Sequence, residues 1–411
     1  MTQRAASHDP CSHPDLSDAW DDASIPTGTV PDPLRTGQGD VVDRAGWPRR
    51  RQEILDLVRY HVYGHLPAEP PSVRFTLCSL DHSALGAAAT RVQVSGHLGQ
   101  RPISVLVYLP NTTPQPVPCF LAFNNRGNHT VHPDPGIALA TRWVPAGPGV
   151  VNHRATDAAR GSAAHQWPIE GLLRRGYAVA TVYADDIAPD DPVEFQRQAC
   201  TGHPLLRPLG GRRAEDCGAI GAWAWGLSHV VDFLESVPAL DARRITVGQS
   251  RMATPTLWAA AQDPRIAMCI ATNPEHAGAS LGRRTAGERR HTLAHVRPHW
   301  FCARATSSAD RDHALPIDQH LLSLIAPRPL YVANTGDDGR GDPCGDYLAL
   351  RHAASVYALL TGDALPHTPP DRPLHGRLSY HRRCGQRDLT AWDWDQFTTA
   401  ADTCLAKETT T

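Results

Sequence analysis

Short apolar runs rich in β-branched residues alternate along this chain with segments whose apolar residues recur every three or four positions. The runs resemble buried strands, and the amphipathic segments are typical of helices. We expect strands at 90–94, 103–109, 118–124, 177–183 and 266–271, and helices at 52–60, 167–175 and 218–236. The alternation continues through 321–325, 329–333, 349–360, 378–381 and 393–405. This order predicts a doubly wound, mostly parallel α/β sheet with helices on both faces.

The first part of the chain lacks this periodicity. Residues 1–44 mix Pro, Gly, Ser, Thr and Asp, so we expect an extended N-terminal tail followed by one domain over 45–408. A further Pro- and Gly-rich stretch, 132–161, is expected to be a surface insertion within that domain.

Composition narrows the possible partners. The 411 residues carry a formal net charge of −2, which gives no electrostatic reason to expect nucleic acid or an anionic membrane. A small-molecule or oligosaccharide substrate fits better, and no motif calls for a cofactor. None of the ten cysteines forms a Cys-x-x-Cys pair. The N-terminus has no apolar signal-peptide core, so a cytoplasmic location is expected, or a secreted one if the start is misassigned.

Residues 244–253 carry the strongest local signal for chemistry. A β-branched run ends in Gly248-Gln249-Ser250 and passes into the helix-favouring segment 256–261. This is the strand-turn-helix setting of a nucleophile elbow, in which the serine hydroxyl is exposed and the next backbone N–H, that of Arg251, faces the developing oxyanion. Met252 stands where the usual motif has its second glycine, and the alternative is an ordinary helix-capping serine.

Partners for Ser250 are expected in the chain order serine, acid, histidine that the α/β-hydrolase fold shows. Asp338 follows the late strand 329–333 at the expected offset, with Asp342 as second candidate; turn or cap roles are the alternative. His381 ends the last short strand and is the best candidate for the base. The loop 124–129 could supply a second oxyanion donor or be a plain solvated loop.

Three histidines raise the alternative of a metal site. His291, His295 and His299 repeat at four-residue spacing, which can place imidazoles on one helix face. Pro298 interrupts that helix and no His-Glu-x-x-His frame is present, so we expect no metal.

The elbow also carries a family resemblance. Residues 248–253, followed by 257–265, resemble the nucleophile segment of the glucuronoyl esterases, carbohydrate esterase family fifteen, bacterial branch. Further similar stretches are 127–130, 218–226, 298–301, 315–320, 325–329, 380–381 and 388–390. The resemblance covers the chain from about Gly127 to Leu405.

The resemblance implies an α/β-hydrolase that cleaves esters between 4-O-methyl-glucuronic acid of xylan and lignin alcohols through an acyl-serine. It implies that Ser250 is the nucleophile, His381 the base and Asp338 the acid. In the same way Arg251 matches an arginine that holds the oxyanion, and Glu288 a glutamate that contacts sugar hydroxyls. Some relatives carry the acid after the strand that follows the elbow helix, which here would be Glu275.

Two family sugar contacts are replaced in this chain. Thr254 stands in place of a lysine, and Arg340 in place of a tryptophan; the Arg340 guanidinium could restore a hydrogen-bond donor. Esterase chemistry is therefore better supported than glucuronate specificity. The alternatives are an esterase for acetyl or other small acyl groups, and a carbohydrate-binding relative without turnover.

Overall fold

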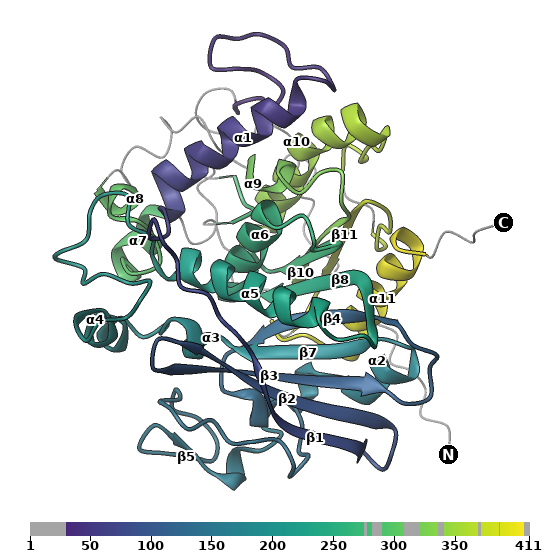
Figure 1. Ribbon diagram of the computed structural model, residues 1–411. Helices are drawn as coiled ribbons and strands as arrows, with labels where there is room; N and C mark the ends of the chain where they lie inside the picture. The colour runs from purple at the N-terminus through teal and green to yellow at the C-terminus, as the bar shows by residue number, and fades with distance from the viewer. Residues whose placement is uncertain are drawn as a thin grey trace.

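The computed structural model describes residues 30–274, 278–281, 290–307, 320–335, 341–368, 371–385 and 387–406. Over these ranges the chain builds a nine-stranded sheet in the order β1-β2-β3-β7-β4-β8-β9-β10-β11 (Figure 1). Its strands are β1 (Thr76–Ala84), β2 (Ala89–Leu98), β3 (Arg101–Pro110), β4 (Val117–Asn124), β7 (Ala178–Tyr183), β8 (Leu240–Gln249), β9 (Met268–Thr272), β10 (Leu330–Thr335) and β11 (Leu378–Arg383). The two short strands β5 (Val150–Val151) and β6 (Arg154–Ala155) pair separately.

Strand direction divides the sheet into two parts. The pairs β1·β2, β2·β3 and β3·β7 are antiparallel, whereas every pair from β7·β4 to β10·β11 is parallel. The parallel strands therefore share one edge at which their carboxyl ends meet, and loops leaving that edge can bring distant residues together. The predicted mostly parallel α/β sheet is confirmed.

Helices cover both faces of the sheet. They are α1 (Trp47–Val58), α2 (Ile169–Arg174), α3 (Ala184–Ile187), α4 (Pro192–Cys200), α5 (Ala219–Glu235), α6 (Ala253–Gln262), α7 (Arg290–Val296), α8 (Ala303–Ser307), α9 (His320–Ser323), α10 (Pro343–Thr361) and α11 (Ala391–Cys404). Within these described ranges no helix is both long enough and apolar enough to cross a lipid bilayer.

Alternation along the strands separates two hydrophobic cores. In β4, Leu121 belongs to the core that contains Trp223 of α5 and Leu257 of α6, whereas its neighbour Phe120 belongs to the core that contains Trp394 of α11. Successive strand side chains point to opposite faces, so α5 and α6 lie on one side and α11 on the other (Figure 1).

The segment before α1 packs on this fold. Residues 30–44 were expected to belong to an extended tail, yet the Val42 side chain is buried. The buried Arg50 of α1 also donates from Nε to the Pro33 carbonyl at 3.2 Å. These contacts tie the end of the expected tail to the first helix.

Candidate active site

Ser250 lies at the tip of a strained turn between β8 and α6. Its φ of +51° is in the left-handed region, which non-glycine residues adopt at a cost of roughly 1–3 kcal/mol and which is concentrated at functional sites. A short 3₁₀ turn, Ser250–Met252, leads directly into α6. The strand-turn-helix geometry expected of a nucleophile elbow is present.

A cavity of about 710 Å³ opens beside this serine. Its wall is formed by residues 122–126, 130, 163, 166, 167, 247, 249–252, 293, 296, 297, 300, 387–389 and 394. The wall combines the end of β4, the elbow, the segment around α7 and the loop between β11 and α11. The volume is in the range of pockets that hold small ligands.

The loop after β4 reaches the cavity as the sequence predicts. Asn124, Asn125 and Arg126 line the wall. The buried Asn124 side chain holds the loop, because its Oδ1 accepts the Gly127 N–H at 2.8 Å and its Nδ2 donates to Thr181 Oγ1 at 3.0 Å. This loop and the residue after Ser250 are the two places from which an α/β-hydrolase directs backbone N–H groups at an oxyanion.

The Arg251 side chain is held by Asp190, a residue outside every motif in the sequence. Arg251 Nη1 donates to Asp190 Oδ2, and the same carboxylate accepts from Trp300 Nε1 at 2.9 Å and lies 3.5 Å from Arg297 Nη1. Asp190 follows β7 by several residues and shares no sequence motif with the elbow, so only the folded chain brings them together.

The Asp185 carboxyl group, which interacts with both Asp190 and Arg251, differs in its pKa from an ordinary surface acid. Burial raises the pKa of Asp185 to about 7, and the negative charge of nearby Asp190 adds to the rise, while Arg251 opposes it. Asp190 is the carboxylate that pairs directly with the Arg251 guanidinium.

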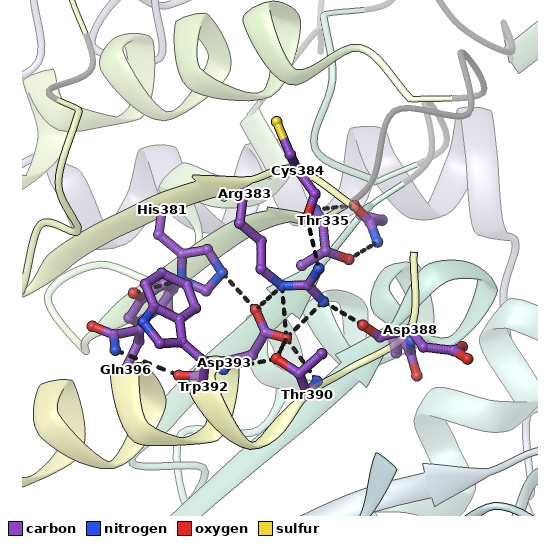
Figure 2. A network of polar contacts seen from close by, with 12 residues as sticks. Thr335, His381, Arg383, Cys384, Asp388, Thr390, Trp392, Asp393 and Gln396 are labelled. Carbon is purple, nitrogen blue, oxygen red and sulfur yellow. Dashed lines mark hydrogen bonds and ion pairs between the residues drawn. The ribbon is translucent and has the colours of Figure 1, made fainter. Parts of the chain in front are cut away.

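His381 does not face the cavity. It lies within β11 with a side chain that is 1% exposed, and it packs at 5.8 Å between ring centroids against Phe397 of α11. Its Nε2 is 3.1 Å from Asp393 Oδ1 (Figure 2). Its Nδ1 is 2.9 Å from Tyr331 Oη. Burial lowers the pKa of His381, so its neutral ring donates to Asp393 and accepts from Tyr331.

The prediction that His381 serves Ser250 as a base is therefore wrong in this geometry. Both ring nitrogens have partners inside the core, and the residue is absent from the cavity wall. Along the described wall of the cavity there is no histidine at all.

Asp393 organises the turn that follows β11. It closes a capping box with Thr390 at the start of α11 and accepts Arg383 Nε at 2.8 Å in addition to His381 (Figure 2). Burial alone would raise the pKa of Asp393, but hydrogen bonds from His381 and Arg383 hold it far below its ordinary value. The carboxylate thus stays ionised and joins the end of β11 to the start of α11.

Arg387 is the residue of this loop that reaches the elbow. Its carbonyl oxygen accepts hydrogen bonds from the side chains of Thr335 at 3.0 Å, Gln249 at 3.2 Å and Asn273 at 3.3 Å. These three donors lie at or just beyond the carboxyl ends of β10, β8 and β9. The Arg387 side chain lines the cavity together with Ser250.

The remaining predicted residues divide into two groups. Asp338, Arg340, Glu288 and Glu275 lie outside the described residues, and their roles stay predictions. Asp342 is 3% exposed and caps α10 by accepting the Gly345 N–H at 2.9 Å, which is the cap role considered as its alternative.

Thr254 does not act as a sugar contact in this structure. It is 1% exposed and is not part of the cavity wall. A Cβ atom on Gly278 would lie 2.6 Å from Thr254 Oγ1, so the threonine packs against backbone from beyond β9.

The described parts of the chain hold no cluster of three or more His, Cys, Asp or Glu side chains suited to a metal ion. His299, one of the three histidines considered for a metal, is buried, with Nε2 2.8 Å from the Asp190 carbonyl oxygen. It therefore supports the backbone that carries Asp190.

Fold and elbow together define an α/β-hydrolase, and comparison with known proteins gives the family. A family model described as fungal glucuronyl esterase matches residues 211–361. The carbohydrate esterase MZ0003, from an unknown prokaryotic organism, is 37% identical over 93% of this chain and 91% of its own length. The chain belongs to the glucuronoyl esterase family, carbohydrate esterase family fifteen, which is a family of carboxylic ester hydrolases.

Solved structures agree with this assignment. A promiscuous esterase of this family from a marine bacterial metagenome superposes with a TM-score of 0.83 at 35% identity, over 94% of this chain and 99% of that one. The glucuronoyl esterase from Solibacter usitatus gives 0.83 at 34% identity, over 93% and 99%. The 4-O-methyl-glucuronoyl methylesterase of Podospora anserina is 28% identical over 74% of this chain and 55% of that protein.

Proposed function

We propose that this chain binds esters of acidic sugars in the cavity beside Ser250 and cleaves them through an acyl-Ser250 intermediate. The observation that carries the proposal is the positive-φ serine at the elbow, opening into a cavity whose wall includes Arg126, Arg251, Arg297 and Arg387. The named activities of the relatives, glucuronoyl esterase and glucuronoyl methylesterase, support the sugar-ester class.

The chemistry follows from the elbow geometry. Ser250 Oγ attacks the ester carbonyl carbon, the bond to the alcohol oxygen breaks, and the Ser250 proton leaves with that oxygen as the free alcohol. Water then attacks the acyl-serine, returns one proton to Ser250 Oγ and releases the acid. In this proposal the Arg251 N–H and the loop 124–126, which line the same cavity, stabilise the negative oxygen that forms at each attack. Asp190 orients the Arg251 guanidinium toward the same cavity.

Hydrolysis of benzyl glucuronate by the chain and by Ser250→Ala tests the proposal. We expect Ser250→Ala to lower the rate by at least about 100-fold, because a positioned nucleophile contributes that much or more. Ser236→Ala, which removes a hydroxyl that donates to the Phe233 carbonyl at the end of α5, is the matched control and should leave the rate unchanged.

Parallel assays with 4-nitrophenyl acetate separate the alternatives. Cleavage of the acetate without cleavage of benzyl glucuronate would indicate a small-acyl esterase. Equal rates for Ser250→Ala and the unaltered chain on both esters would remove Ser250 from the reaction. If neither ester is cleaved faster than in the absence of protein, a carbohydrate-binding role is favoured.

A further inference from the structure

A second cavity lies at the edge of the sheet where β7 ends. Its volume is about 580 Å³, and its wall is formed by residues 101, 102, 141–143, 152–154, 185, 189, 194, 197 and 198. We call this cavity the insertion pocket, because residues 141–143 and 152–154 belong to the Pro- and Gly-rich stretch 132–161. Arg101 begins β3, which runs antiparallel to β7, so it reaches the same edge from the other direction.

The segment 185–190 lies between the insertion pocket and the cavity beside Ser250. Asp185 lines the insertion pocket, whereas Asp190 holds the Arg251 side chain that lines the Ser250 cavity. Five residues of chain span at most about 18 Å, so the two acids lie within that distance of each other. The two cavities are therefore close enough for one oligosaccharide to reach both.

The insertion contributes a stacked pair of rings to the insertion pocket. The Trp143 and His153 rings lie 4.9 Å apart between centroids, at an interplanar angle of 12°. The Trp143 carbonyl accepts the Tyr183 hydroxyl at 3.2 Å, and the Val144 N–H donates to the His153 carbonyl at 3.1 Å. Trp143 is half-buried and His153 is exposed, so the pair is open to a ligand. A flat aromatic surface of this kind packs against the apolar face of a sugar ring.

The turn between β5 and β6 holds His153 in an uncommon backbone conformation. Asn152 and His153 have φ values of +50° and +59°, as a two-residue hairpin turn requires. Glycine adopts this conformation without steric cost, whereas a histidine is strained there. The chain nevertheless has a histidine at this position, and its ring completes the stack with Trp143.

Positive charge exceeds negative charge in the wall of the insertion pocket. The charged residues are four arginines and two acids, namely Arg101, Arg142, Arg154, Arg197, Asp185 and Glu194. Glu194 already pairs with Arg197, whose Nε donates to Glu194 Oε2 at 2.7 Å. The other three arginines share one acid on this wall, Asp185, whose Oδ2 accepts the Tyr183 hydroxyl at 3.2 Å. Such a wall favours an anionic ligand.

Arg101 is the least compensated of these cations. Its Nε and Nη2 are covered and have no hydrogen-bond partner within the parts of the chain that the structure describes. Besides Glu194, the acid that interacts with its charge is Asp186, whose Oδ2 accepts the Ser104 N–H at 3.0 Å. Burial, together with the charge of Arg142, lowers the pKa of Arg101 to about 10, so the guanidinium still carries its charge at neutral pH. A covered cation of this kind is stabilised by an anion in the cavity that it lines.

We infer that the insertion pocket binds an unesterified uronate unit of the saccharide whose ester is cleaved at Ser250. The inference rests on the proposed function, since it takes the Ser250 cavity as the ester site. The sugar ring packs on the Trp143–His153 pair, and its carboxylate meets the positive charges of Arg101 and Arg142. A saccharide with several uronate units is then held through one free acid group while the ester of another is cleaved.

Calorimetric titration with two matched ligands tests the inference. Methyl β-D-glucuronide and methyl β-D-glucoside share one ring and differ in a carboxylate against a hydroxymethyl group. We expect the glucuronide to bind at least ten-fold more tightly, with a preference that shrinks as NaCl screens the charge. Equal affinity for the two ligands, or no binding of either, would overturn the inference.

Charge variants then assign the preference to the insertion pocket. Arg142→Gln and Arg101→Gln keep hydrogen-bonding groups but remove one charge, so the preference for the glucuronide should fall to about two-fold or less. Arg49→Gln, on α1 with a side chain that is 89% exposed, should retain the full preference. A preference that survives in Arg142→Gln would assign it to other groups and contradict the inference, including the case in which Arg101→Gln does not fold.

Trp143→Ala separates ring packing from charge. Because the ring supports the sugar and not its carboxylate, the affinities for both ligands should fall by at least about five-fold, with the preference for the glucuronide retained. Unchanged affinities in Trp143→Ala would show that the sugar ring does not lie on this pair.

Inhibition distinguishes the insertion pocket from the cavity beside Ser250. Methyl β-D-glucuronide, at a concentration that saturates the chain in calorimetry, should leave the KM for benzyl glucuronate within about two-fold of its original value. A larger, competitive rise in KM would place the ligand in the Ser250 cavity and overturn the inference. Failure of the proposed function would appear differently, as hydrolysis that does not depend on Ser250, while the binding comparisons stayed intact.

Discussion

At Gly248, a Cβ atom would lie 2.5 Å from the Met252 carbonyl oxygen and 2.7 Å from the Ala253 Cα. Both are backbone atoms of the elbow, so they cannot move aside as a flexible side chain would. We expect Gly248→Ala to lower the free energy of unfolding by roughly 1–3 kcal/mol and to displace Ser250. Urea unfolding and benzyl glucuronate hydrolysis measure the two effects.

The control for this substitution is Gly37→Ala, where a Cβ atom meets nothing within 4 Å. A Gly248→Ala variant as stable and as active as Gly37→Ala would mean that the elbow tolerates a side chain at this residue, and that the Gly-x-Ser pattern has no steric cause.

Single residues also show which parts of the site the sequence could predict. Ser250 and Arg251 were predictable because a nucleophile elbow is local, and its strand, glycine and helix are consecutive in the chain. Asp190 and Arg387 were not, because each lies in a loop whose place depends on long-range contacts. The sequence gives no indication that an arginine in a loop lies at the active site. The hydrogen bonds of the Arg387 carbonyl oxygen with side chains at three strand ends form only in the folded chain.

Among the elements, the connection from β11 to α11 is built around Asp393, whose side chain is 0% exposed. Asp393→Asn would leave the charge of Arg383, 7% exposed, without its buried partner. Removal of one member of a buried ion pair costs about 3–5 kcal/mol, so we expect a loss of that size in the free energy of unfolding, measured in urea.

Asp395→Asn, on the same helix, is the matched control. Its carboxylate is 57% exposed and pairs with Arg175 at the surface, so the change should stay below about 1 kcal/mol. Similar losses in the two variants would contradict the view that burial of the Asp393 network holds this connection.

Helices and strands were easiest to predict where their side chains are buried on both faces or along one whole face. All six residues of β7 are buried, and its apolar run is plain in the sequence. β1 was missed because it is an edge strand with mostly exposed side chains, including Leu77 and Leu80, so it shows no hydrophobic alternation.

Over the whole molecule, the order of elements along the chain was sufficient to predict the fold. It was not sufficient to predict which residue acts as a base for Ser250. His381 follows Ser250 in the expected order, yet it lies inside a strand, and a strand side chain points to a face of the sheet. That face is covered by α11, whose Phe397 and Trp392 pack around the ring. Residues that act at the carboxyl edge must instead come from beyond the strand ends, as Arg387 does.

Several histidines buried in the fold couple its stability to pH. Burial lowers the pKa of His129 to about 4, His203 to about 3, His299 to about 4 and His320 to about 3. The unfolded chain therefore binds more protons below about pH 6.5, and each such group lowers stability as pH falls. The raised pKa values of Asp185 and Asp186, both about 7, act in the opposite direction.

A single variant isolates one of these groups from the opposing acids. His320 is 0% exposed, and His320→Leu removes its titration while keeping an apolar volume in the core. Relative to this variant, the unaltered chain should lose about 1.4 kcal/mol of unfolding free energy per pH unit between about pH 6.5 and about pH 4. Urea unfolding at about pH 7 and about pH 5 measures the difference, with the exposed His97→Gln as control. A difference that is the same at both pH values would show that His320 does not carry this coupling.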